Sequence, residues 1–134
     1  MSEETVEQVR NAYDTFNRRD WEGFRRLIDR DVVVESRLVQ MEGGYRGYEG
    51  LRRWWDQVFE MIPDYRVEIQ ELREVGDIVL VQSLGLGHGA SSGTPVVDPF
   101  WHALEMKDGR CTWWRNCSTE AEALAAIAER SGPS

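Results

Sequence analysis

The sequence predicts an α+β fold in a single domain, residues 1–134. Helical spacing of apolar residues dominates the first half of the chain, whereas the second half holds four successive stretches with the alternation of β-strands. With 134 residues and 41% hydrophobic content, the chain is long enough for one domain with a substantial core and too short for two. We expect a strongly bent antiparallel sheet that closes over one face of the early helices.

Four helices are expected. Apolar residues recur every three or four positions over Glu4–Arg18, and Asp20 is suited to cap a second, shorter helix. A broad apolar stripe predicts a third helix over Tyr48–Met61, which Pro63 ends. The pair Ser118-Thr119 is expected to cap a short final helix.

Strands are expected at Asp31–Gln40, Tyr65–Glu71 and Ile78–His88, because β-branched and apolar residues alternate with polar ones or fill both faces. The stretch Phe100–Trp114 is expected to be a hairpin. Its turn contains Asp108-Gly109, which supplies the positive φ that a short hairpin needs.

The hairpin furnishes the most informative pattern in the chain, because side chains alternate between the two faces of a strand. Before the turn, one face carries Phe100, His102, Leu104 and Met106. After the turn, parity predicts Thr112, Trp114 and Asn116 on one face and Cys111, Trp113, Arg115 and Cys117 on the other. A histidine, an asparagine and an indole that project into apolar surroundings indicate a small binding pocket.

Composition excludes some classes of partner. The formal charge of −8 disfavours nucleic acid and an anionic membrane surface, both of which need a positive patch. On one strand, Cys111 and Cys117 would lie roughly 20 Å apart and could not pair. Free thiols, the absence of a signal-peptide pattern and the absence of a membrane-span pattern lead us to expect a cytoplasmic protein.

The order of elements and several motifs resemble the SnoaL-like branch of the nuclear transport factor 2-like superfamily, from about Val6 to Ile127. The motifs that carry the resemblance are Asn17-Arg18-Arg19-Asp20-Trp21, Tyr45-Arg46-Gly47-Tyr48-Glu49-Gly50-Leu51, Gly76-Asp77 and Lys107-Asp108-Gly109-Arg110. The resemblance implies a cone-shaped fold, in which a strongly curved mixed or antiparallel sheet wraps around a long N-terminal helix and leaves a pocket at the open end.

Function is less constrained, because the superfamily contains polyketide cyclases, ketosteroid isomerases, dehydratases, epoxide hydrolases and non-enzymatic binders. By comparison with ketosteroid isomerase, the general-base aspartate would fall at Ser36. The oxyanion tyrosine would fall near Ala12, next to Tyr13, and the protonated aspartate at His102. Similarity to polyketide cyclases, which keep a polar acid/base residue on the same strand, favours His102 as the reactive group.

We therefore expect a cofactor-independent acid/base enzyme for a small apolar, possibly cyclic or polyketide-like molecule. His102 would move the proton, and Asn116 with Tyr13 or Tyr48 would bind a carbonyl or enolate oxygen. The substrate-binding candidates are Ser36, Tyr48, Trp54, Trp55, Phe100, Leu104 and Trp114. The alternatives are a core histidine bonded to Tyr, Ser or a backbone carbonyl, and a binding module without chemistry.

The partner of His102 stays open among Asp98, Glu35 and Tyr48. Asp98 shares parity with His102 unless Pro99 bulges the strand. His88 is interpreted as a solvated loop residue, and we expect neither a cofactor nor a metal, since two distant histidines provide no ligand cluster. An outer sheet face with Cys111, Trp113 and Cys117 would be costly in water, which favours a homodimer through that face.

Overall fold

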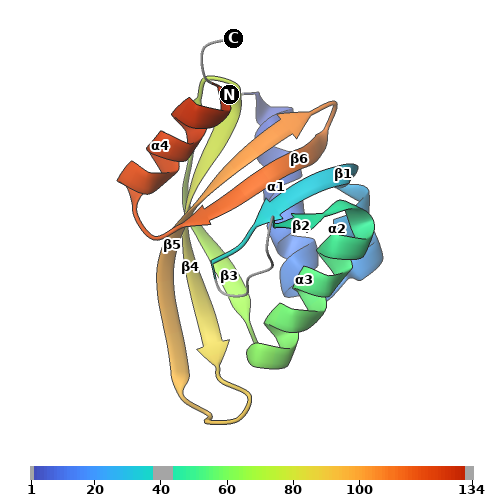
Figure 1. The fold of residues 1–134 in the computed structure, drawn as a ribbon, viewed down its shortest axis with the longest axis vertical. Coiled ribbons are helices and arrows are strands. Elements are labelled where there is room, and N and C mark those ends of the chain that lie inside the picture. Colours follow the sequence, from blue (N-terminus) through green and yellow to red (C-terminus); the bar gives the residue numbers. More distant parts are fainter. Residues whose placement is uncertain (1, 38–43, 132–134) are drawn as a thin grey trace.

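We describe residues 2–37 and 44–131 of a computed structural model (Figure 1). These residues form four helices and one six-stranded sheet. In chain order the elements are α1 (Glu3–Asn17), α2 (Trp21–Arg26), β1 (Ile28–Glu35), β2 (Tyr45–Arg46), α3 (Gly47–Met61), β3 (Arg66–Val75), β4 (Ile78–His88), β5 (Pro95–Lys107), β6 (Arg110–Cys117) and α4 (Glu120–Arg130). In the described part of the chain, no helix has the length and apolar character needed to cross a membrane.

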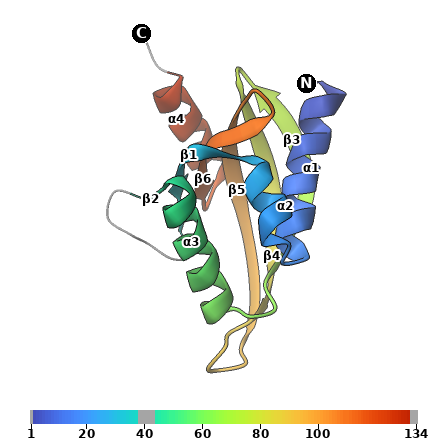
Figure 2. The same ribbon diagram turned by 90° about the vertical axis from the view of Figure 1, so that its right-hand side faces the viewer.

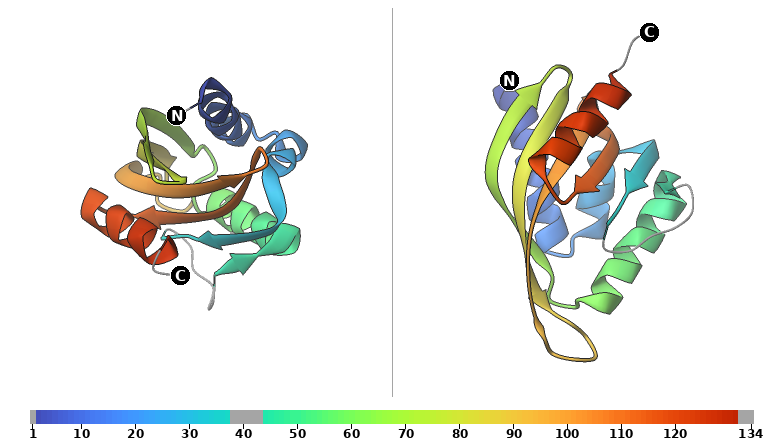
Figure 3. Two further views of the ribbon diagram at one scale, coloured as in Figure 1. Left: turned by 90° about the horizontal axis from the view of Figure 1, so that it is seen from above. Right: turned by 60° about the vertical axis from the view of Figure 1, so that its left-hand side comes forward.

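The sheet has the strand order β2-β1-β6-β5-β4-β3. Strands β3 to β6 are antiparallel in succession, as predicted, whereas β1 lies parallel to β6. The sheet curls without closing (Figure 3). Helices α1, α2 and α3 lie on its concave side and α4 on the opposite side (Figure 2). The predicted α+β cone is therefore confirmed.

Most differences from the predicted elements lie at strand ends. Strand β1 begins at Ile28, and residues 38–40 of the predicted strand fall outside the described residues. The two-residue strand β2 was not predicted, because so short a stretch carries no periodicity. Strand β5 begins at Pro95, since its ladder with β4 runs without a shift from Glu105 to Pro95. Pro99 therefore makes no bulge, and Asp98 keeps its parity with His102.

The bulge occurs near the other end of β5. The predicted turn is confirmed, with φ of 51° at Asp108 and 79° at Gly109. Beyond it, the register between β5 and β6 shifts next to Met106, whose partner is Cys111. Cys111 consequently faces the concave side, whereas Thr112 bonds to Glu105 on the other. The parity prediction was wrong for Cys111 and Thr112, because a bulge reverses the alternation.

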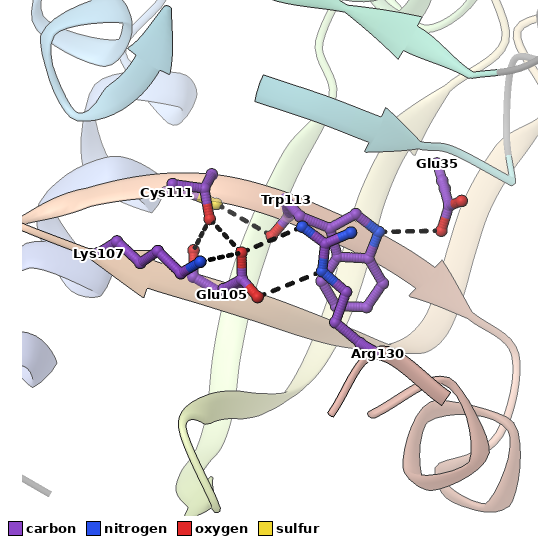
Figure 4. A network of polar contacts seen from close by, with 7 residues as sticks. Glu35, Glu105, Lys107, Cys111, Trp113 and Arg130 are labelled. Carbon is purple, nitrogen blue, oxygen red and sulfur yellow. Dashed lines mark hydrogen bonds and ion pairs between the residues drawn. The ribbon is translucent and has the colours of Figure 1, made fainter. Parts of the chain in front are cut away.

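Helix α4 covers much of the outer sheet face. Trp113 and Cys117 are 4% and 3% exposed and pack against Ala123, Ala126 and Ile127 of α4. The helix is also held by charge, since the Arg130 guanidinium donates to both oxygens of Glu105 at 3.1 and 3.2 Å (Figure 4). The homodimer was predicted because these side chains were expected to face water. That reason was wrong for Trp113 and Cys117, which α4 of the same chain buries.

Asn17 joins the end of α1 to the start of β3. Its Nδ2 donates to the Val67 carbonyl, and its Oδ1 accepts from the Val67 amide, both at 2.9 Å. Asn17→Ala leaves both half-buried backbone groups unpaired, so we expect the free energy of unfolding to fall by about 2 kcal/mol in urea titrations. Asn17→Asp keeps the acceptor and should cost less. Equal stability of Asn17→Ala and wild type would show that these two hydrogen bonds do not stabilise the junction of α1 and β3.

Candidate functional site

A cavity of about 70 Å³ lies between the concave face of the sheet and helices α1 and α3. Its walls are almost entirely apolar. Residues of α1, α3, β5 and β6 all contribute, among them Val9, Phe16, Trp54, Val58, Leu104 and Trp114. An apolar cavity of roughly 150 Å³ is known to hold a benzene ring, so this one, about half as large, suits at most one small ring, and that only with some movement of its side chains.

The walls are made rigid by aromatic contacts. Trp54 and Trp114 meet edge to face with ring centroids 5.0 Å apart, and Phe24 lies against both. Parity placed Trp114 on this side of the sheet, and the structure has it there. Large aromatic rings with two rotatable bonds supply a fixed shape at little entropic cost, which favours a defined pocket over a collapsible one.

His102 is the polar centre of the cavity wall. It projects from β5 beside Phe100, with ring centroids 4.6 Å apart. Tyr13 of α1 reaches across the cavity, and its Oη lies 2.5 Å from His102 Nδ1. The partner of His102 is therefore a tyrosine from the helix, and none of the carboxylates considered from the sequence bonds to it.

Asn116 lies directly opposite His102 in the ladder between β5 and β6, with its Nδ2 3.5 Å from His102 Nε2. Its Oδ1 accepts a hydrogen bond from Arg37 Nε at 3.0 Å. Arg37 Nη2 in turn lies 2.7 Å from Asp98 Oδ2. These contacts form a continuous polar chain from Asp98 to Tyr13 along one side of the cavity.

Burial, with a smaller contribution from the positive charge of Arg37, lowers the pKa of His102 to about 3. The ring is half-buried by accessible surface, because part of it faces the cavity, yet protein atoms enclose it on the other sides. Burial also raises the pKa of the Tyr13 hydroxyl well above its usual value, with the nearby Ser83 hydroxyl offsetting a part of the rise. At neutral pH the pair is therefore an uncharged imidazole and an uncharged phenol.

Two further hydroxyls lie buried close by. Among the described residues, Tyr65 Oη and Ser83 Oγ have no hydrogen-bond partner, and Ser83 is fully buried. Ser83 thus affects the pKa of Tyr13 from a position outside hydrogen-bonding geometry. Each unsatisfied buried hydroxyl costs about 1–3 kcal/mol, which an oxygen-bearing guest or a water in the cavity would offset. Tyr65 lines that cavity.

A model of the SnoaL-like domain matches residues 9–114 of the sequence. The chain belongs to the SnoaL-like domain family. The family predicted from the sequence is thus confirmed, and a search of curated proteins found no significant match.

Solved structures agree with this SnoaL-like fold. A nuclear transport factor 2-like protein of unknown function from Burkholderia pseudomallei has a TM-score of 0.78 and 22% identity, over 95% of this chain and 98% of that one. TerC, co-crystallised with polyporic acid, has a TM-score of 0.76 and 23% identity over 94% and 98%. A protein with a ketosteroid isomerase-like fold from Catenulispora acidiphila, in complex with trimethylamine, has a TM-score of 0.75 and 19% identity, over 89% of this chain and 90% of that one.

The SnoaL-like cavity brings together all but two of the candidate residues: Tyr13, Ser36, Trp54, Phe100, His102, Leu104, Trp114 and Asn116 all line it. Trp55 instead belongs to the aromatic core, where it packs on Trp21 and Phe24. The Tyr48 hydroxyl donates to the Ile28 carbonyl at 3.0 Å, away from the cavity. Neither residue is therefore placed to contact a guest.

The other expected polar residues also lie elsewhere. Glu35 accepts from Trp113 Nε1 at 3.1 Å on the outer face. His88 ends β4 and is exposed, and its Nδ1 is 2.7 Å from Asp64 Oδ2. No group of three or more metal-ligating side chains gathers within the described ranges, and the expected absence of a metal stays a prediction.

Sequence reasoning missed Arg37, Tyr65 and Ser83. Arg37 follows the end of β1, where strand alternation no longer applies, and its Nε donates to Asn116, which lines the cavity. Ser83 carried a usable signal, because it is the single hydroxyl on the inner face of an apolar strand. Tyr65 approaches β4 so closely that a side chain on Gly85 would collide with its ring, a contact that sequence alone does not reveal.

Proposed function

We propose that this SnoaL-like chain is a cofactor-independent enzyme that moves a proton within a small, largely apolar molecule bearing a carbonyl group. The observation that supports it most is the short contact between Tyr13 and His102 on the wall of an otherwise apolar cavity. An uncharged imidazole has one nitrogen free to accept a proton, and a protonated phenol can donate a hydrogen bond to an oxygen.

In the proposed step, the unprotonated ring nitrogen of His102 takes a proton from the carbon next to the carbonyl. The C–H bond breaks, its electron pair forms the enolate, and the Tyr13 hydroxyl stabilises the negative oxygen by a hydrogen bond. Return of the proton to a different carbon completes an isomerisation, and attack of the enolate on a second carbonyl would complete a cyclisation. Phe100, Trp54 and Trp114 exclude water from the reacting atoms.

The volume of the cavity limits the substrate. At about 70 Å³ it favours a single small ring or a short chain over a multi-ring polyketide. A relative binds trimethylamine, a molecule of this size class, whereas TerC binds the larger polyporic acid. A polyketide-like substrate therefore requires displacement of wall side chains, and we propose a monocyclic ketone as the smallest competent guest.

Deuterium exchange tests the chemistry without a known substrate. Cyclopentanone is incubated with the protein in D₂O, and loss of its α-proton signal is followed by NMR. We expect exchange above the buffer rate that falls at least about tenfold in His102→Gln and Tyr13→Phe, since general acid–base groups contribute about 10²–10⁴-fold. The matched control His88→Gln should retain the full rate. Equal exchange in wild type and His102→Gln would overturn the proposal.

The pH dependence of that exchange separates His102 from an ordinary histidine. The base acts in its neutral form, and its pKa of about 3 keeps it neutral throughout the usual range. The protein-catalysed rate should therefore be flat between pH 5 and 8 and fall only when the pH approaches 3. A midpoint near pH 6.5 would indicate a solvent-exposed histidine as the base.

A binding module without chemistry is the second candidate, and the same low pKa favours it. A catalytic base works best when its pKa lies near the working pH, so this imidazole is a weak proton acceptor. Saturable binding of cyclopentanone with no exchange above the buffer rate would assign the cavity to this class.

We also propose a homodimer and a cytoplasmic location. Val97, close to the start of β5, is 67% exposed, which leaves apolar surface for a second copy. Both cysteines are free thiols, as a reducing compartment would keep them. Light scattering at micromolar concentration tests the dimer, and a monomer there would contradict it.

A further inference from the structure

Each hydrogen bond in the series from Arg37 to Tyr13 has a fixed donor and a fixed acceptor. A guanidinium only donates hydrogen bonds, so the Asn116 atom that faces Arg37 must be the carbonyl Oδ1. The amide group is planar, and its Nδ2 is thereby turned toward His102 Nε2 at 3.5 Å. Because Nδ2 is also only a donor, Nε2 has to be the acceptor.

The position of the proton on His102 follows. A neutral imidazole carries one N–H, and with Nε2 accepting, that proton lies on Nδ1 and is donated to Tyr13 Oη. In the opposite tautomer, Nε2–H would meet the Asn116 N–H, donor against donor, and Tyr13 would donate its own proton to Nδ1. The hydroxyl proton of Tyr13 is therefore available to a guest only in the first arrangement.

We propose that Arg37 is a positioning residue that sets the tautomer of His102 through Asn116. This inference deepens the proposed function and rests on it for its chemical meaning. It makes Nε2 the nitrogen that carries the lone pair, which accepts the substrate proton once a guest displaces the long 3.5 Å contact with Asn116, and it leaves the Tyr13 hydroxyl to donate to the substrate oxygen. Arg37 itself need not touch the substrate.

The fold holds Arg37 in place for this role. Strands β1 and β6 are parallel, and the pairs Val34 with Trp114 and Glu35 with Arg115 carry the chain past the end of β1 toward Asn116. Asp98 Oδ2 lies 2.7 Å from Nη2 of the same guanidinium, in a pair whose side chains are 29% and 21% exposed. A carboxylate only accepts hydrogen bonds, so the ion pair with Asp98 leaves Arg37 as the donor to Asn116.

NMR of the imidazole nitrogens tests the inference. The protein is labelled with ¹⁵N-histidine in a His88→Gln background, which leaves His102 as the single histidine, and long-range ¹H–¹⁵N spectra distinguish the two tautomers. We expect Nδ1–H in the parent protein. Asn116→Asp presents only acceptors to Nε2 and should convert the ring to the Nε2–H form or to the charged form.

Variants of Arg37 distinguish a role in orienting Asn116 from a general effect on the structure. Arg37→Met keeps the length but cannot donate, so Asn116 can rotate and we expect a mixture of tautomers. Arg37→Lys keeps a donor and should retain Nδ1–H. Arg115→Met, on the exposed side of β6 next to Asn116, is the matched control and should leave the spectrum unchanged. Nε2–H in the parent protein, or an Arg37→Met spectrum like that of Arg115→Met, would overturn the inference.

This experiment needs no substrate, so its failure is distinct from failure of the exchange reaction. Where exchange is observed, Arg37→Met should lower its rate at least about tenfold while Arg37→Lys restores most of it, since loss of the required tautomer can cost an enzyme as much as about 10⁴-fold. Exchange at the parent rate in Arg37→Met would also overturn the inference.

Discussion

Replacing Trp114 by alanine is expected to lower the free energy of unfolding by about 3–5 kcal/mol, measured by urea denaturation. Trp114 is 5% exposed and packs on Trp54 and Phe24, so its loss removes apolar contact from the centre of the molecule and enlarges the cavity. Trp114→Phe keeps one ring and should cost about half as much. The enlarged cavity of Trp114→Ala should also bind benzene more tightly than the wild-type cavity does.

Trp21→Ala is the matched control for that prediction. Trp21 is half-buried: it meets Trp55 edge to face, and the Arg52 guanidinium lies 4.9 Å from its ring centroid. Its truncation should cost no more than about 2 kcal/mol, because the surrounding side chains and water can fill the space. If Trp114→Ala costs no more than Trp21→Ala, the indole does not form the wall described above.

A loss of stability in mild acid is the second large effect, and it reports on His102. In the unfolded chain this histidine binds a proton below its ordinary pKa of about 6.5, whereas in the folded protein the pKa is about 3. Between these values the unfolded state holds the extra proton, so stability falls as the pH falls. The slope should approach about 1.4 kcal/mol per pH unit.

The window from pH 4.5 to 6.5 isolates this contribution. The pKa values of Asp64 and Glu105 are lowered from their ordinary values of 3.8 and 4.5, by the His88 and Arg130 contacts respectively, so most of the effect of these carboxylates on stability lies below the window. His102→Gln should remove most of the slope, and His88→Gln should retain it. A slope unchanged in His102→Gln would show that the imidazole is not sequestered from water.

Local sequence signals were sufficient to predict the helices and the succession of strands along the chain. Asp20 and Thr119 accept the capping hydrogen bonds expected of them, and Asp108-Gly109 adopts the positive φ that its turn requires. Each of these depends on residues only a few positions apart. The parallel pairing of β1 with β6 depends on residues about 80 positions apart, and no periodicity encodes it.

In the candidate site, too, local patterns predicted some residues and long-range packing decided the others. Alternation along β5 correctly placed Phe100 and His102 in one cavity, because a strand without a bulge keeps its parity. Alternation along β6 failed for Cys111, where a bulge intervenes, and no alternation applies to Arg37, which lies beyond the end of β1. The hydrogen-bond partner of His102 came from α1, which packs across the sheet, so strand parity could not identify Tyr13 as that partner.

We expect the Tyr13 hydroxyl to be the main hydrogen-bond donor to the oxygen of a small guest in the apolar cavity. Binding of cyclopentanone and of cyclopentane, followed by the fluorescence of the cavity tryptophans, tests it most directly. We predict that the ketone binds about fivefold more tightly, as one hydrogen bond of about 1 kcal/mol allows, and that Tyr13→Phe removes most of the difference. Equal affinity for the two molecules in the wild-type protein, or no binding of either, would contradict it.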